Sequence, residues 1–512
     1  MPPSSAGRLA TRVAAGVLLT RILGFVRERV FAHYFGNTPV ADAFRAALKI
    51  PNVIRNLLGE GTLAASFIPV YAGMIERNET ENARRLAGVI VSLLIVLTAV
   101  AALLGILLAP VITAIAAPGF SGTTRALTVT LVAIMFPMSG LTILSAWCLG
   151  ILNTHRRFFL SYAAPAVWNV AQIATLVALG LYWAGARLAI ALAWGALAGS
   201  ALQLAVQLPS TLRYAGTLHW SLDLTTAGAR AVIRGWVPVV FGAGVAQISS
   251  IVDTQLGSLL GNGAVAVLGY AQLIAALPVS LFGVSVAAAA LPEMSRDAAG
   301  QGVEILRRRL SQGARRVVFF VVPSAVAFVV LGVPIVGLLF QTGQFRAEDT
   351  RVVALVLAAY ALGLPAQASV KLLASGFYAQ GDTRSPVRAA AISMFLSAAL
   401  AALLMQWYGP TGIALGASIA AYVNVTLHFE GLKAKVGSLF GPSTAATVTL
   451  VLGSAALASA AGVALERLVT GRPPWLTAVT STAAFSLTYL ISTALLGHED
   501  ARALVRRFAP RS

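Results

Sequence analysis

Charged side chains interrupt two otherwise apolar stretches near the start of the chain, residues 13–35 and 40–73. An ionisable residue inside a membrane costs at least ~2.5–3.5 kcal/mol, so it usually faces a cavity or a partner. Six of these residues are cations and three are anions: Arg21, Arg27, Arg29, Arg45, Lys49, Arg55, Glu28, Asp42 and Glu60. Arginine binds phosphate oxygens through paired hydrogen bonds. The surplus of cations therefore indicates a cavity that binds a phosphate-bearing ligand.

Two more ionisable residues, Asp253 and Lys371, lie inside later apolar stretches. We predict that the residues in contact with the ligand are Arg21, Arg27, Lys49, Asn52, Arg55 and Lys371. We predict that Glu28, Asp42 and Glu60 act as counter-ions or in conformational change. Structural roles stay open for some of them. Glu28 and Lys49 could reach the membrane surface, and Asp42 could pair with Arg45 on the same helix face.

Asp253 is a lone acid whose neighbours carry oxygen atoms: Ser249, Ser250, Thr254 and Gln255. Such a group could hold Na⁺ or relay a proton, so coupling to Na⁺, to H⁺ or to the membrane potential is open. Alternatively, Asp253 pairs with an arginine from another part of the chain. Cys148 is the only cysteine, which excludes a disulfide framework or a zinc cluster. We expect no cofactor and no catalytic residue.

The elements that carry these residues are expected to be membrane helices. The chain has 512 residues, of which 58% are hydrophobic and only 11% charged, against roughly 25% charged in soluble proteins. Residues 86–115 contain no charge, and about 20 apolar residues suffice to cross a bilayer as a helix. We predict an all-α membrane protein with fourteen spans: 13–35, 40–73, 86–115, 126–152, 158–182, 188–212, 235–260, 264–292, 317–341, 352–379, 387–408, 411–432, 443–465 and 475–497.

The loop charges test this arrangement and predict its orientation. With the N-terminus inside, the inner segments hold 24 of the 37 Lys and Arg residues and the outer loops hold six. This ratio agrees with the positive-inside rule. Both termini are therefore predicted to be cytoplasmic in a bacterial inner membrane. The net charge of +19 is explained by these loops, so we expect no nucleic acid partner.

A weak repeat predicts how the spans are grouped. Ile50-Pro51 and Ile68-Pro69 in the second span have counterparts in Leu277-Pro278 and Leu291-Pro292 in the eighth. Inverted or parallel repeats are common in transporters. We predict that the chain has three parts. They are an N-terminal lobe at 1–220, a C-terminal lobe at 221–437, and two final helices with a tail at 438–512.

Several motifs resemble the MurJ (MviN) family of lipid II flippases. They are Thr20-Arg21-Ile22-Leu23-Gly24-Phe25-Val26-Arg27-Glu28, Ala41-Asp42-Ala43-Phe44, Lys49-Ile50-Pro51-Asn52-Val53-Ile54-Arg55 and Gly381-Asp382-Thr383-Arg384-Ser385-Pro386. The resemblance implies two six-helix lobes around a cationic cavity, two extra helices, and export of lipid II by alternating access. It also implies that Arg21, Arg27 and Arg55 are essential cavity residues.

This sequence departs from the family pattern at two places. Asn56 stands where the family often has a second basic residue, and Gln272-Leu273 stands where it often has Asp-Arg. The second lobe is therefore expected to contribute fewer charges, with Lys371 as a possible compensation.

Three other classes of protein would each require particular features in the sequence. A flippase for another polyprenyl-linked glycan stays open, because it would need the same cationic cavity. An exporter of organic cations would need an acidic cavity. An enzyme would need a catalytic carboxylate in a substantial loop, and the outer loops are short. We expect a monomer that binds lipid II and membrane lipids and associates with the cell-wall synthesis machinery.

Overall fold

The structure is a computed structural model that describes residues 5–216, 220–261, 263–287, 290, 294, 303–439, 441–469 and 471–508. A few side chains inside helices lie outside this description, at residues 5–12, 14, 60, 241–243, 245–246, 248–250, 303, 442–443 and 507–508. The predicted side-chain role of Glu60 and the two serines beside Asp253 therefore fall outside the described residues.

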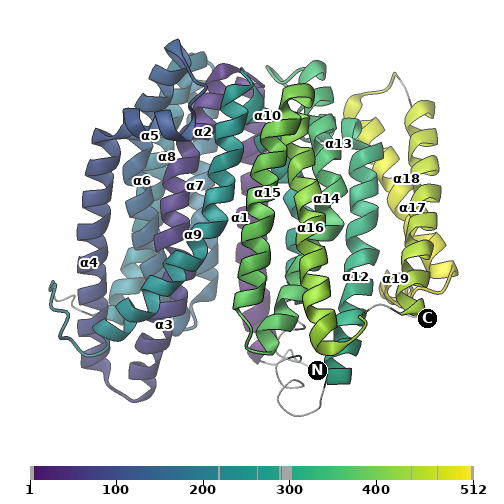
Figure 1. Cartoon of the computed structure of the whole chain (residues 1–512). Coiled ribbons are helices and arrows are strands. Elements are labelled where there is room, and N and C mark those ends of the chain that lie inside the picture. The colour runs from purple at the N-terminus through teal and green to yellow at the C-terminus, as the bar shows by residue number, and fades with distance from the viewer. Residues whose placement is uncertain are drawn as a thin grey trace. The chain divides into compact units, whose positions relative to one another are not determined.

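All the regular elements of the described residues are helices, which confirms the predicted all-α class (Figure 1). The earlier ones are α1 (Ser5–Phe35), α2 (Pro39–Leu58), α3 (Glu60–Glu76), α4 (Thr80–Leu107), α5 (Ala109–Ala116), α6 (Gly122–Thr154), α7 (Phe158–Leu179), α8 (Gly185–Ala215) and α9 (Ala229–Leu259). The later ones are α10 (Ala264–Pro278), the π-helical turn η1 (Val279–Gly283), α12 (Val303–Val330), α13 (Gly332–Phe340), α14 (Ala347–Ala379), α15 (Arg384–Tyr408), α16 (Pro410–Val436), α17 (Pro442–Leu468), α18 (Pro474–Leu495) and α19 (Glu499–Phe508).

Twelve helical segments of the described chain are long and apolar enough to cross a membrane. The other two expected spans, 13–35 and 235–260, fall in α1 and α9, which are helical through these ranges except for the last residue of 235–260. Helix α1 carries six charged residues, Arg8, Arg12, Arg21, Arg27, Glu28 and Arg29, which make it more polar than an ordinary span. The predicted number of fourteen is thus approximate.

The chain divides into two compact units. The first unit comprises Met1–Ala266 with Thr342–Gln344, and the second comprises Val267–Gln341 with Phe345–Ser512. The predicted three-part division at 220 and 437 stays a prediction.

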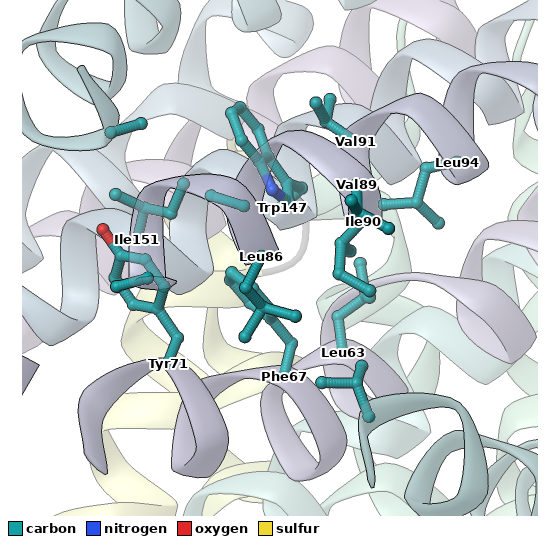
Figure 2. Close-up of a cluster of buried hydrophobic side chains, with 14 of the residues drawn as sticks. Leu63, Phe67, Tyr71, Leu86, Val89, Ile90, Val91, Leu94, Trp147 and Ile151 are labelled. Atoms are coloured by element: carbon teal, nitrogen blue, oxygen red, sulfur yellow. The ribbon is translucent and has the colours of Figure 1, made fainter. Parts of the chain in front are cut away.

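Helices α3, α4 and α6 contribute most of the residues of an apolar cluster in the first unit (Figure 2). Phe67 and Tyr71 of α3 and Leu86 of α4 are fully buried, and Trp147 of α6 is 1% exposed. The opposite side of α4 exposes large apolar residues: Val96, Leu97, Val100, Leu103, Leu104 and Leu107. A helix with apolar residues on both faces is typical of a membrane span, because lipid replaces water at its outer face.

Gly59 separates α2 from α3. The interruption lies at Gly59, and Pro51 lies inside α2. The Gly59 N–H donates to the carbonyl of Arg55 at 2.8 Å. A Cβ added at Gly59 would lie 2.4 Å from that oxygen, so the chain can make this turn only with glycine.

Small residues allow close helix contacts in the second unit. Gly363 of α14 faces Ser418 of α16, where an added Cβ would lie 2.7 Å from the hydroxyl oxygen. The Ser418 hydroxyl donates to the carbonyl of Ala359 at 2.6 Å. Small side chains and interhelical hydrogen bonds of this kind hold membrane helices together.

A second apolar cluster joins α12 to the last three helices, which lie together at the yellow end of the chain in Figure 1. Phe319 of α12 packs with Val451 of α17 and Phe485 of α18. The Tyr489 hydroxyl of α18 donates to the carbonyl of Phe319 at 2.7 Å. The final helices of the chain are therefore part of the second unit.

Candidate functional site

Three of the predicted ligand-binding arginines line one cavity in the first unit. Helix α1 packs along α7, and the cavity has a volume of about 550 Å³. Arg21 and Arg27 enter its wall from α1, and Arg55 enters it from the last turn of α2. Residues separated by up to 34 positions in the sequence therefore share one site.

The rest of the cavity wall combines polar and aromatic side chains with a few apolar ones, among them Val17, Leu149 and Pro165. It includes Thr142 of α6, Ser161 and Asn169 of α7, and Gln203 of α8. Gln203 is itself held by a hydrogen bond of 2.9 Å from its amide to the hydroxyl of Ser145. No acidic residue is among the described residues that line the cavity. This lining suits an anion with several oxygen atoms.

Glu28 joins two arginines in a buried triad. One carboxylate oxygen accepts from Arg27 Nη2 at 2.6 Å, and the other accepts from Arg45 Nη2 at 2.7 Å. The three side chains are only 11–16% exposed. Two guanidinium groups against one carboxylate leave one net positive charge beside the cavity. Arg45 also lies over the ring of Phe31 at 5.1 Å, which adds a cation–π contact.

Asp42 occupies the first turn of α2, and its side chain is buried, at 1% exposure. Its carboxylate accepts hydrogen bonds from the N–H groups of Gly263 at 2.5 Å and Ala266 at 2.7 Å. These groups lie at the start of α10, where backbone N–H groups have no partners within the helix. Asp42 therefore caps α10 from a distant part of the chain, and a carboxylate is favoured there by the helix dipole.

Comparison with known proteins gives the family. The family model described as "Lipid II flippase MurJ" matches residues 31–482. A probable lipid II flippase MurJ of Rhizobium meliloti is 33% identical over 430 residues, which cover 82% of this chain and 79% of that protein. The lipid II flippase MurJ of Burkholderia cenocepacia is 31% identical, with 85% of each chain covered. The chain belongs to the lipid II flippase MurJ family.

Solved structures agree with this assignment at the level of the fold. A structure of lipid II flippase MurJ in an inward closed conformation has a TM-score of 0.79 and 24% identity, covering 96% of this chain and 99% of that chain. An inward-facing multidrug resistance MATE family transporter of the MOP superfamily has a TM-score of 0.69 and 15% identity, covering 84% of this chain. The MurJ family is a transporter family and not a class of enzymes.

The remaining predicted residues of the first unit lie between α2 and α9. Lys49 interacts electrostatically with Asp253. For this acid the sequence allowed either a sodium ion or an arginine as the partner. One turn and two turns further along α2 lie Asn52 and Asn56, and the Asn56 amide donates to Gln247 at 3.2 Å. Lys49 and Asn52 are not among the residues that line the 550 Å³ cavity.

Of the residues at which the sequence departs from the family pattern, Asn56 and Gln272 are neutral groups that form hydrogen bonds, and Leu273 is apolar. Asn56 bonds to Gln247, and Gln272 donates to the hydroxyl of Tyr360 at 2.9 Å within the second unit. Lys371 is an exposed residue of α14, also in the second unit. The predicted contact of Lys371 with the ligand stays a prediction.

The cavity residues on α6, α7 and α8 were not identified from the sequence. Trp168, Asn169 and Gln203 are neutral, and nothing in their own segments distinguishes a cavity residue from an ordinary helix contact. A polar residue within an apolar span was the only available signal. The partnership of Glu28 with Arg45 was also missed, because the two residues lie on different helices.

Proposed function

We propose that this member of the MurJ family transports lipid II, the undecaprenyl-pyrophosphate-linked peptidoglycan precursor, from the cytoplasmic to the outer leaflet. The observation that carries the proposal is the cavity lined by Arg21, Arg27 and Arg55, with no acid among its described lining residues. The names of its relatives supply the substrate. Together they support a role in cell-wall biosynthesis.

In the proposed mechanism, the pyrophosphate enters the cavity and the undecaprenyl chain stays in the lipid. Arginine is suited to this step because its planar group bonds to two phosphate oxygens and keeps its charge at any physiological pH. The hydroxyl group of Ser161 and the amide group of Gln203, which line the cavity, would bond to the sugar and peptide part. Alternating access then exposes the head group on the outer side, and Asp42 would release and recapture the start of α10 during this change.

The proposal includes an inner-membrane location with both termini in the cytoplasm, as the loop charges indicate. It also includes action as a monomer, association with the cell-wall synthesis machinery, and no catalytic step. The driving force is proposed to be Na⁺, H⁺ or the membrane potential. If Na⁺ or H⁺ drives transport, we propose that the ion acts at Asp253, which interacts electrostatically with Lys49.

Complementation tests the proposal. The native lipid II flippase is depleted from a rod-shaped bacterium, and the wild-type chain or a variant is expressed in its place. We expect the wild type to restore growth and Arg21→Ala or Arg55→Ala to fail at equal membrane abundance. Arg85→Ala is the matched control, because Arg85 is an exposed arginine of α4 paired with Glu81.

Two results would contradict parts of the proposal. Growth with the Arg21→Ala or Arg55→Ala variant would reject the cavity as the binding site. Failure of a well-expressed wild type would instead favour a different polyprenyl-linked glycan as the substrate, since such a ligand would carry the same pyrophosphate.

A further inference from the structure

We propose that one face of α7, formed by Trp168, Asn169 and Gln172, positions Arg27 for anion binding. The three residues are spaced so that they share one side of the helix. None of them was identified from the sequence. The inference deepens the proposed function, and rests on it, because it explains how one of the three cavity arginines is held in place.

Trp168 supplies a flat surface for the guanidinium group. The Arg27 Cζ atom lies 4.7 Å from the centroid of the Trp168 ring, within the range of a cation–π contact. The ring is itself fixed, because its Nε1–H donates to the carbonyl of Ala196 on α8 at 3.1 Å. Arg27 therefore rests on a side chain that is anchored to a third helix.

Asn169 fixes the direction of the guanidinium group. Its side-chain oxygen accepts from Arg27 Nη1 at 3.2 Å. Its side-chain nitrogen lies 3.4 Å from the carbonyl of Thr20 on α1 and 3.3 Å from that of Pro165 on α7. Asn169 is only 4% exposed. A buried amide with contacts on both sides has one preferred orientation, so its oxygen is directed at Arg27.

Gln172 extends the same face toward the acidic side of the triad. With Arg27, Glu28 and Arg45, it lines a small space of about 20 Å³. The α7 face therefore borders the triad beyond the contacts that Trp168 and Asn169 make with Arg27.

The arrangement has a consequence for binding. Arginine has five N–H donors, and the contacts to Asn169 and Glu28 use only two of its nitrogens. Arg27 also lines the 550 Å³ cavity. A guanidinium held before the ligand arrives loses less conformational freedom on binding, which favours affinity. We therefore expect Trp168 and Asn169 to act through Arg27.

A double-mutant cycle in the purified full-length protein tests this role. The probe is farnesyl diphosphate, with farnesol as the uncharged control. We expect Trp168→Leu to weaken farnesyl diphosphate binding about 3- to 30-fold, the range of a partly buried cation–π contact. Trp168→Phe keeps a ring face and is expected to weaken it by less than about 3-fold. Trp194→Leu is the matched control, because Trp194 is 57% exposed on α8.

The same Trp168→Leu substitution in a protein that lacks Arg27 distinguishes a positioning role from a general structural effect. In an Arg27→Gln protein, Trp168→Leu should change the affinity by less than about 2-fold, since the group it positions is gone. An equal loss in both backgrounds overturns the inference.

Thermal unfolding without any ligand gives an independent measurement on the same four proteins. We expect the effects of Trp168→Leu and Arg27→Gln on unfolding to be non-additive, because the residues are in contact. Additive effects overturn the inference whatever the binding result. If the coupling is present but the wild type binds farnesyl diphosphate no better than farnesol, the positioning contact stands and the proposed function fails.

Discussion

At the scale of single residues, Glu28 is the carboxylate that compensates the buried charges of Arg27 and Arg45. Its two oxygens are shared between Arg27 and Arg45, and all three side chains are largely buried. A buried charge is tolerated only when it is paired and hydrogen-bonded. Removal of the carboxylate therefore affects both arginines at once.

We predict that Glu28→Ala lowers the free energy of unfolding by about 3–5 kcal/mol, the usual cost of breaking a buried ion pair. Thermal or denaturant unfolding in detergent measures it. Glu81→Ala is the matched control, because Glu81 forms an exposed ion pair with Arg85, and it should change stability by less than about 0.5 kcal/mol. Equal effects of the two substitutions would show that the triad has no special role.

Asp42 is the second residue whose role depends on burial. A carboxylate can accept from both N–H groups at the start of α10, whereas a carboxamide offers one oxygen and a competing N–H₂ group. We predict that Asp42→Asn lowers the free energy of unfolding by about 1–3 kcal/mol, the cost of an unsatisfied buried group. The exposed residue Asp223, which bonds locally to Thr225, provides the control Asp223→Asn. No difference between the two variants would argue against the cap.

At the scale of elements, α2 connects two sites. Asp42 lies in its first turn and Arg55 in its last. A helix rises 1.5 Å per residue, so the two residues are roughly 20 Å apart along the axis. Helix α2 therefore reaches from the capped start of α10 to the cavity. The turn at Gly59 then decides where this helix ends.

Gly59 provides the test at this scale. We predict that Gly59→Ala costs about 1–3 kcal/mol of stability, since the new methyl group must displace the Arg55 carbonyl or the turn. Gly61→Ala is the control, because nothing lies within 4 Å of its added Cβ and alanine favours helix. Thermal unfolding of both variants checks the prediction, which fails if Gly59→Ala is as stable as Gly61→Ala.

At the scale of the whole molecule, the distribution of basic residues predicts the orientation in the membrane. We predict that a cysteine in place of Tyr182, an 80% exposed residue after α7, is labelled from outside intact cells by an impermeant maleimide. A cysteine in place of Glu81, at the start of α4, should be labelled only after the membrane is opened. The native Cys148 is buried and should not react. The opposite labelling pattern would reverse the proposed topology.

The arrangement of the helices in the first unit explains why the chain can keep so many charges in apolar segments. In the first unit, Glu28 neutralises one arginine, Asp42 is satisfied by backbone N–H groups, and Lys49 faces Asp253. Arg21, Arg27 and Arg55 line a cavity in which water or an anion can solvate them. The charges named here are thus stabilised in several ways: by ion pairs, by backbone hydrogen bonds and by solvation in a cavity.

The sequence by itself determined the all-α membrane class, most of the spans and the location of the charged helices. Hydrophobic length and charge placement are local properties, so they can be read without a structure. The motifs around Arg21 and Arg55 also indicated the family, and the family model and relatives confirm it.

Only the tertiary structure decided which residues meet. Asp42 caps α10 across more than 200 residues, Arg45 joins Glu28 from another helix, and Trp168 with Asn169 holds Arg27. These partners depend on how helices rotate and pack, and the energy of packing is spread over many weak contacts that no single segment reveals. For that reason the three cavity arginines could be singled out from the sequence, whereas the neutral residues that contact Arg27 could not.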